Sequence, residues 1–177
     1  TEWMLTTTGS IIVGTTSLTF TQMGAPARAF GEVSQQLNVS PTTITNTTSF
    51  FLVNLSGTAL SGLESSFDSP VSGRLRYTGA TTKTFAATAM LGAYAGVTAP
   101  SSLLFRLAKN GTTQSKSEQP LVSQNVAVAE HGGAQVLVSL ATNDYLEVYV
   151  GNLTAIQNVT VVYFNLKTIE AQPDLAA

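Results

Sequence analysis

The stretch QVLVSLATNDYLEVYVGN, residues 135–152, decides the fold class of this chain. Apolar and polar residues alternate along it, and the alternation is interrupted once, at Asn143 and Asp144. The alternating apolar positions are Val136, Val138 and Leu140 before the break and Leu146, Val148 and Val150 after it. A period of two is typical of strands with one buried face, and Asn and Asp favour tight turns. The stretch therefore predicts a β-hairpin, with Asp144 in the turn rather than in a carboxylate or metal site.

Length and charge limit the classes of protein to which the chain can belong. It has 177 residues, which is enough for one domain with a real core. Charged residues make up only 10% of it, the net charge is −2, and the eight Lys and Arg residues are scattered singly. No basic stripe is available to neutralise phosphates or anionic lipid headgroups, so we expect no nucleic-acid partner and no membrane partner.

Processing and redox signals are also scarce in the sequence. There is no cysteine, which excludes disulfides, zinc-thiolate sites and thiol catalysis. No apolar run approaches the ~20 residues that span a bilayer. The N-terminal TEWMLTTTGS lacks the basic start and the apolar region of a signal peptide. We expect a complete, short, soluble chain that is made without secretion.

Segments of strand length follow one another along the chain, and no window shows a sustained helical period. These segments are 42–55, 62–79, 82–96, 102–118 and 158–171, besides the opening stretch. The segment 102–118 contains Asn110-Gly111, a strong hairpin signal because both central positions of a type I′ turn need positive φ. Eight or more short strands separated by turns predict an all-β sandwich or jelly roll.

The closing segment, residues 158–171, carries apolar residues on both faces near its middle. Alternation directs Val162 toward the core, and Val161 and Tyr163 then lie on the opposite face. Tyr145 and Tyr149 occupy the non-core face of their own strand in the same way. A surplus apolar face needs cover, and tyrosine suits an interface because it combines an apolar ring with a polar tip. We expect another copy of the chain to cover it, the alternative being the N-terminal segment of the same chain.

Residues that could support chemistry are few. The single histidine, His131, lies between Glu130 and two glycines, and we interpret it as a solvated loop residue. No serine or carboxylate stands at a spacing that would make a catalytic triad with it. A calcium site from Glu130, Asn143 and Asp144 stays an alternative, because oxygen ligands can converge from distant loops. We expect a protein that is not an enzyme and needs no metal or cofactor.

Three segments resemble the C1q/TNF-like domain found in many tailed-phage virion proteins. They are DSPVSGRLRYTGATTKTFAATAML (68–91), LLFRLAKNGT (103–112) and LVSLATNDYLEVYVGNLT (137–154). The resemblance covers about residues 42–171 and implies a jelly roll of about ten strands that forms a tight homotrimer. The sequence departs from the animal C1q pattern, since Tyr77 is present but the surrounding aromatic-rich strand is not. The receptor functions of animal relatives are therefore not carried over.

The chain divides into an N-terminal arm with its connector, residues 1–32, and a jelly-roll domain, residues 33–177. We expect a small hairpin around Gly14, within residues 10–21, and a connector without regular structure at 23–32. The arm is too apolar for a free tail, and an isolated hairpin is marginal in water. It would dock on a capsid by strand pairing or, alternatively, fold back on its own sandwich. The expected capsid-docking anchors are Ile12, Leu18 and Phe20.

Composition, assembly and resemblance together favour a structural protein of a virion. We expect a homotrimer that decorates or cements a capsid, or forms a head fibre, with the major capsid protein or another virion protein as its partner. The alternative is the receptor-binding tip of a tail fibre, which would contact a host glycan or protein. The residues expected to line the trimer axis are Tyr145, Tyr149, Val161 and Tyr163.

Overall fold

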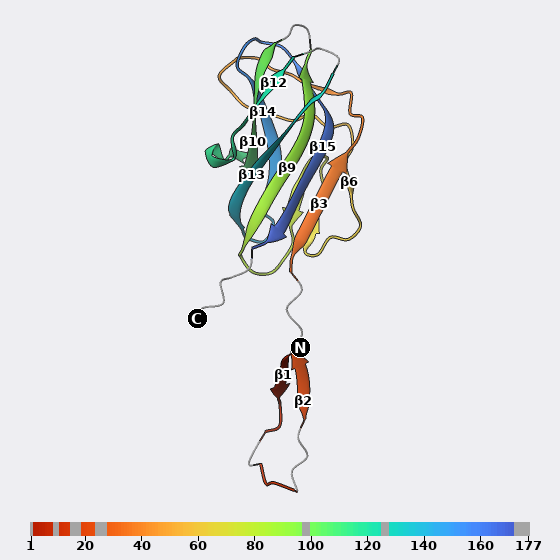
Figure 1. The fold of residues 1–177 in the computed structure, drawn as a ribbon, viewed down its shortest axis with the longest axis vertical. Coiled ribbons are helices and arrows are strands. Elements are labelled where there is room, and N and C mark those ends of the chain that lie inside the picture. Colours follow the sequence, from red (N-terminus) through yellow and green to blue (C-terminus); the bar gives the residue numbers. More distant parts are fainter. Residues whose placement is uncertain are drawn as a thin grey trace.

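A small hairpin and a two-sheet sandwich make up the described part of the molecule. The computed structural model describes residues 2–8, 11–14, 19–23, 28–96, 100–124 and 128–171. Strands β1 (Glu2–Leu5) and β2 (Phe20–Met23) form the antiparallel hairpin, which lies beyond one end of the sandwich (Figure 1). None of the helices among these residues is long and apolar enough to cross a membrane. The predicted all-β jelly-roll sandwich is confirmed.

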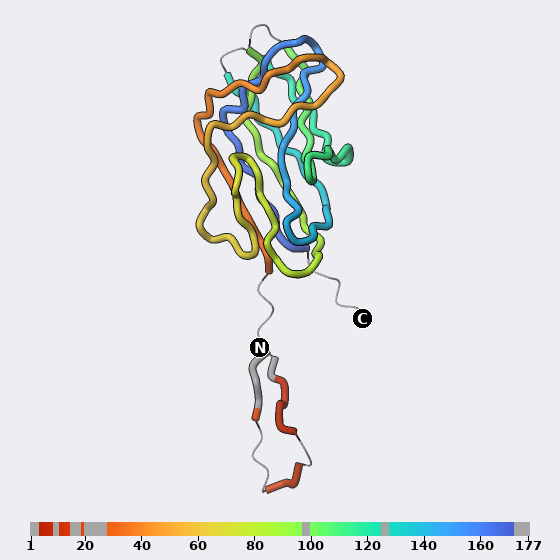
Figure 2. Tube along the Cα trace, turned by 180° about the vertical axis from the view of Figure 1, so that it is seen from behind, coloured from red at the N-terminus to blue at the C-terminus, as the bar shows by residue number. Residues whose placement is uncertain are grey.

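One layer of the sandwich is a seven-stranded antiparallel sheet, seen on the near side in Figure 2. Its main path runs through β11 (Thr112–Thr113), β10 (Ser101–Lys109), β14 (Tyr145–Asn152), β8 (Leu75–Tyr77) and β7 (Phe67–Asp68). The strands β12 (Gln119–Ser123) and β5 (Phe51–Leu52) pair with β10 and β14, and a 3-10 helix, η1 (Ser115–Ser117), precedes β12.

The other layer is a six-stranded antiparallel sheet, which faces the viewer in Figure 1. Its main path runs through β13 (Glu130–Leu140), β9 (Lys83–Ala95), β15 (Val159–Glu170), β3 (Phe30–Gln35) and β6 (Ala59–Leu60). The short strand β4 (Pro41–Thr42) also pairs with β15. Strand β3 begins at Phe30, so residues 30–32, expected in a connector without regular structure, belong to a strand.

The core lies between the two sheets and has an aromatic centre. Phe67, Tyr77 and Phe85 are buried with ring centroids 5.0–5.2 Å apart, and the Tyr77 hydroxyl donates to the Thr81 carbonyl at 2.9 Å. Burying such a side chain contributes on the order of 1.5–3 kcal/mol. Gly31 lets β3 approach this centre, since a Cβ there would stand 2.7 Å from Phe67.

The opening stretch does not form the predicted hairpin. Its turn is present, with Asn143 at φ 70° and the Asp144 amide donating to the Ala141 carbonyl at 2.9 Å. Its strands, however, belong to different sheets, because β13 pairs with β9 and β14 pairs with β10. Alternation shows that each strand has one buried face, but it does not identify the strand beside it. The two apolar faces meet across the core instead of lying in one sheet.

Two other hairpin predictions have different outcomes. The turn at Asn110 and Gly111 is confirmed, since both residues have positive φ and β10 pairs with β11. The arm contains a hairpin in which residues 2–5 pair with 20–23, and the Thr6 amide donates to the Thr19 carbonyl at 2.9 Å. Of the tight turn expected around Gly14, residues 15–18 lie outside the described residues.

Candidate functional site

The outward face of the six-stranded sheet carries large apolar side chains that no described residue of the chain covers. Met90 on β9 is 59% exposed and Leu137 on β13 is 70% exposed. The register aligns Leu137, Ala86 and Ile169 in one row across three strands, and Ile169 is also exposed. The row Gln135, Thr88 and Lys167 separates these side chains from Met90, so exposed apolar residues alternate with polar ones on this face. Exposed apolar side chains on a sheet face are candidates for an interaction surface.

A second row on this face consists of His131, Gly92 and Tyr163, which the register places side by side. The two rings stack above Gly92 with centroids 5.8 Å apart and planes 23° apart. A Cβ at Gly92 would stand 2.8 Å from the Tyr163 ring and 2.9 Å from the His131 ring. Glycine is therefore what allows the two rings to close over the middle strand.

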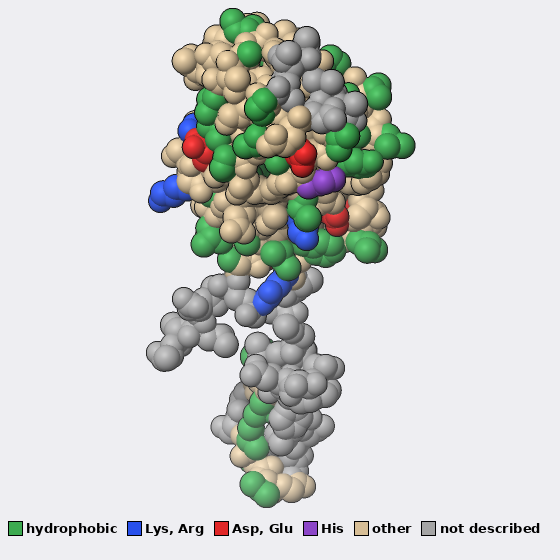
Figure 3. Space-filling model, turned by 45° about the horizontal axis from the view of Figure 1, so that its top comes forward, with side chains coloured by type: hydrophobic (Ala, Val, Ile, Leu, Met, Phe, Trp, Pro, Cys, Tyr) green, Lys and Arg blue, Asp and Glu red, His purple; other side chains and the backbone are tan. Residues whose placement is uncertain are grey.

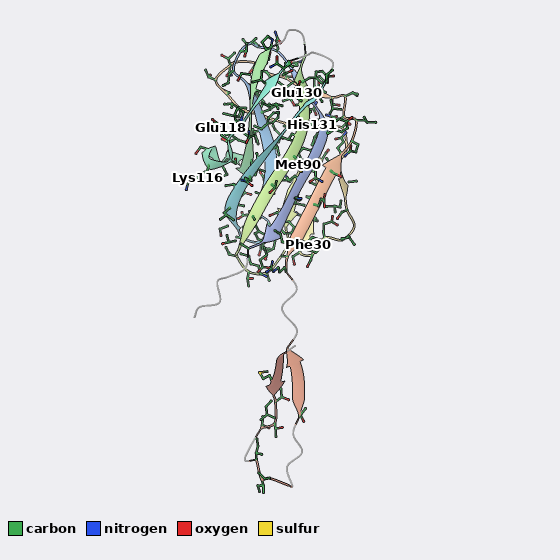
Figure 4. All side chains as sticks on the ribbon, in the orientation of Figure 1. Phe30, Met90, Lys116, Glu118, Glu130 and His131 are labelled. Carbon is green, nitrogen blue, oxygen red and sulfur yellow. The ribbon has the colours of Figure 1, made fainter. Side chains whose placement is uncertain are left out.

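A groove of about 460 Å³ runs beside this ring pair. Figure 4 shows the labelled Met90 and His131 on the same face, and Figure 3 shows the single histidine at the surface among apolar and charged side chains. The groove is lined by Glu32, Gln36, Met90, Leu91, His131, Gly132, Tyr163, Phe164, Asn165 and Lys167. Its lining combines apolar side chains such as Met90 with polar and charged ones such as Asn165 and Lys167, a composition that suits recognition of another surface.

The rim holds two opposite charges that do not pair with each other. Lys167 and Glu32 stand opposite on β15 and β3, yet Glu32 accepts a hydrogen bond from the Asn165 amide instead. In the described ranges neither Lys167 nor Glu32 forms one of the five ion pairs. Neither charge is thus neutralised by an ion pair among the described residues.

Of the four residues expected on the trimer axis, Val161 is placed inside the protein. A β-bulge interrupts the pairing of β15 with β9 between Val161 and Tyr163. The extra residue at the bulge, Val162, interrupts the alternation, so that Val161 and Phe164 point to the same side. Both side chains face the core and both are buried. The expectation that Val161 shares the outward face with Tyr163 is wrong, while Tyr163 does lie on that face, within the ring pair.

Tyr145 and Tyr149 lie on β14, in the opposite sheet from Tyr163. The Arg74 guanidinium sits 3.8 Å above the Tyr145 ring and donates to the Glu147 carboxylate at 2.7 Å. The Glu147 side chain is only 3% exposed. Burial raises the pKa of Tyr149, and the nearby Glu147 carboxylate raises it further. The structure therefore does not bring Tyr145 and Tyr149 together with Tyr163 on one surface of the chain.

The docking anchors expected in the arm are only partly visible. Ile12 is exposed, Leu18 lies outside the described residues, and for Phe20 only the backbone, in β2, is described. Other apolar residues of the arm are also uncovered, namely Met4, Leu5, Ile11 and Val13. The described residues of the sandwich leave these side chains exposed.

His131 and the proposed calcium ligands have different positions from those expected. His131 belongs to β13, where it stacks on Tyr163, and the loop interpretation is wrong. Asp144 binds Lys109, Asn110 and the Ala141 amide at 2.7–2.8 Å, whereas Glu130 lies at the other end of β13, on the order of 30 Å away along the strand. Glu130 and Asp144 cannot share an ion. Within the ranges that the structure covers, no three His, Asp or Glu residues cluster as metal ligands.

These two sheets and their strand order define a TNF-like jelly roll. The chain is similar to murine APRIL, of the TNF family, with a TM-score of 0.51 and 8% identity over 82% of this chain and 100% of that chain. It is also similar to the viral PRD1 vertex protein P5, with a TM-score of 0.50 and 13% identity over 82% of this chain and 97% of that chain. Neither a protein-family model nor a curated protein sequence matches the chain. At these identities the likeness establishes the fold.

Proposed function

We propose that this chain is a non-enzymatic structural protein of a virion, a homotrimer that decorates or cements a capsid or forms a head fibre. The observation that carries this proposal is a set of apolar side chains on the outward face of the six-stranded sheet, namely the exposed Met90 and Leu137 and the half-buried Tyr163. A face of this kind is covered by self-association in many oligomers. The jelly roll that the chain shares with a viral vertex protein supports a place in a virion.

The N-terminal hairpin is the part that we assign to docking. A two-stranded hairpin is marginally stable alone in water, and this one leaves apolar side chains such as Ile12 and Val13 exposed. Its outer strand edges can pair with a strand of a capsid protein, with the apolar side chains filling pockets beside it. In this proposal the hairpin attaches the protein to the capsid, and the sandwich forms the outer part.

The test compares the full chain with a chain that lacks residues 1–27. The deletion ends before Ala29, because the Ala29 amide donates to the Glu170 carboxylate at 2.9 Å and holds the start of the sandwich. We expect both proteins to scatter light as trimers and to melt at nearly the same temperature. Only the full chain should co-sediment with capsids from which the protein has been stripped. A monomeric full chain at micromolar concentration, or equal capsid binding by both chains, contradicts the proposal.

A receptor-binding tip is the second candidate, and one observation favours it. Leu153 and Ile156 are exposed in the loop between β14 and β15, at the end of the sandwich opposite the hairpin (Figure 1). A tip that contacts a host surface would use side chains at this distal end. Binding of the full chain to host cells that is lost in a Leu153→Ser, Ile156→Ser variant distinguishes this function from capsid decoration.

A further inference from the structure

The segment between β3 and β4 is built around one buried amide, Asn38. This side chain is 1% exposed, and its NH₂ group donates to the carbonyls of Val161 at 2.9 Å and Asn54 at 3.0 Å. Its carbonyl oxygen accepts the amides of Ser40 at 3.2 Å and Ser56 at 3.3 Å. A buried side chain with so many partners specifies one conformation, because each lost bond would leave a polar group unsatisfied.

The Asn38 network also holds the β-bulge of the closing strand. The Asn38 backbone amide donates to the Val162 carbonyl at 2.9 Å, within the bulge, and its side chain binds the adjacent Val161 carbonyl. The bulge is where the chain turns Val161 inward and leaves Tyr163 in the groove wall. One network therefore fixes both the Asn38 segment and one wall of the groove.

The two neighbours of Asn38 are large apolar residues that point into solvent. Leu37 is 70% exposed and Val39 is 80% exposed. Leu37 also has φ 55°, a left-handed conformation that is uncommon for leucine. Rigid presentation of two apolar side chains at an unusual backbone geometry is the kind of local feature that points to a function.

We infer that Leu37 and Val39 form a docking knob that enters the groove beside Met90 and Tyr163 on the next copy of this chain. The inference rests on the proposed trimer and names the contact that builds it. Gln36 lines the groove and directly precedes Leu37, so knob and groove adjoin on one side of the molecule. In a closed ring of identical subunits, each copy then offers one knob and receives one.

The chemistry of the groove fits a second copy as its occupant. Met90 supplies a flexible apolar side chain on the groove floor that can adapt to leucine and valine. At the rim, Lys167 and Glu32 carry opposite charges outside the ion pairs of the described chain. A second copy brings the same two charges, so each can meet its opposite across the contact. Because Asn38 already holds the knob in place, docking orders few additional groups.

The first experiment removes the apolar groups of the knob and keeps its backbone. A Leu37→Asn, Val39→Ser variant is suitable because asparagine tolerates the left-handed conformation. We expect the concentration for half-dissociation, measured by light scattering, to rise by about 100-fold as two buried apolar side chains are lost. The matched control is Ile156→Ser, which removes an exposed side chain at the distal loop and should leave the dissociation unchanged. An unchanged mass profile for the knob variant overturns the inference.

The second experiment uses the absence of cysteine from the chain. A Val39→Cys, Met90→Cys double variant, oxidised with copper phenanthroline, should form disulfides between copies and run as a covalent trimer without reductant. A Val122→Cys, Met90→Cys variant should not, because Val122 lies on the outward face of the other sheet. If light scattering shows trimers but no intermolecular crosslink forms, the docking knob is refuted and the proposed trimer still stands. A monomeric wild-type chain overturns the trimer itself.

Discussion

The two outward faces of the sandwich differ in how many of their charged and apolar side chains have partners within the chain. On the seven-stranded sheet, Arg74 pairs with Glu147 and covers Tyr145, and Arg106 pairs with Glu118 and lies 4.1 Å over the Phe50 ring. On the six-stranded sheet, Met90 and Leu137 are uncovered, and Lys167 and Glu32 stand outside the ion pairs of the described residues. On the first face, both of these arginines find their partners within the same chain. The second face leaves apolar side chains exposed that the proposed contact with another copy would cover.

Tyr163→Asp gives the largest effect that this difference predicts. The substitution would bury a charge without a partner in the proposed contact, at a cost of several kcal/mol, so the trimer should be lost at micromolar concentration. The isolated chain should stay folded, because Tyr163 is only half-buried on an outer face. Light scattering and circular dichroism measure the two effects. Val122→Asp on the other face is the control, and equal loss of mass in both variants would refute the distinction between the faces.

Glu147→Gln should act on folding rather than on assembly. Glu147 is 2% exposed and accepts two hydrogen bonds from Arg74, at 2.7 and 3.0 Å. Removing its charge weakens both bonds, and we expect the free energy of unfolding to fall by about 1–3 kcal/mol in a urea titration. The oligomer mass should not change. Loss of the trimer would mean that the seven-stranded face also takes part in association.

Gly92→Ala tests the ring pair at smaller cost. A Cβ at residue 92 would force the Tyr163 and His131 rings apart, and because both rings lie at the surface we expect a loss of only about 1 kcal/mol in stability. Dissociation of the trimer should nevertheless increase, since Tyr163 would leave its position in the groove wall. Gly57→Ala is the matched control, because a Cβ there meets nothing within 4 Å. Identical behaviour of the two variants would show that the ring pair has no role in assembly.

The smallest predicted effect is a dependence on acid at the corner that joins the two sheets. Burial alone would raise the pKa of Asp144, but hydrogen bonds from Lys109, Asn110 and the Ala141 amide outweigh it and lower that pKa. A carboxyl with a lowered pKa stabilises the folded state above its unfolded pKa of ~3.9, and this contribution is lost as the pH falls through the lower folded value. Asp144→Asn should therefore lose about 0.5–1 kcal/mol at pH 7 and show a weaker decline of stability below pH ~4. A parallel pH profile for wild type and variant would contradict this account.

Several features of the fold were determined by local sequence. Period-two alternation predicted the strands β13 and β14, and Asn110-Gly111 predicted the turn after β10, because these signals depend on neighbouring residues alone. The turn at Asn143 followed for the same reason. The jelly-roll class could be predicted because many short strands with turns between them have few ways to bury their apolar faces.

Other features were decided only by the tertiary structure. Alternation could not show that β13 and β14 enter different sheets, because strand partners are chosen by contacts far apart in sequence. It also placed Val161 on the wrong face, since one bulged residue reverses the side to which the preceding residues point. Nothing in the local sequence distinguishes Asn38 from other polar residues. Its role depends on hydrogen bonds to the carbonyls of Asn54 and Val161, which are distant in the chain. The candidate surface depends on strand pairings and contacts between residues far apart in sequence. The sequence therefore placed Tyr163 on an outward surface, but it could not predict the groove or the exposed Leu37 and Val39 beside Asn38.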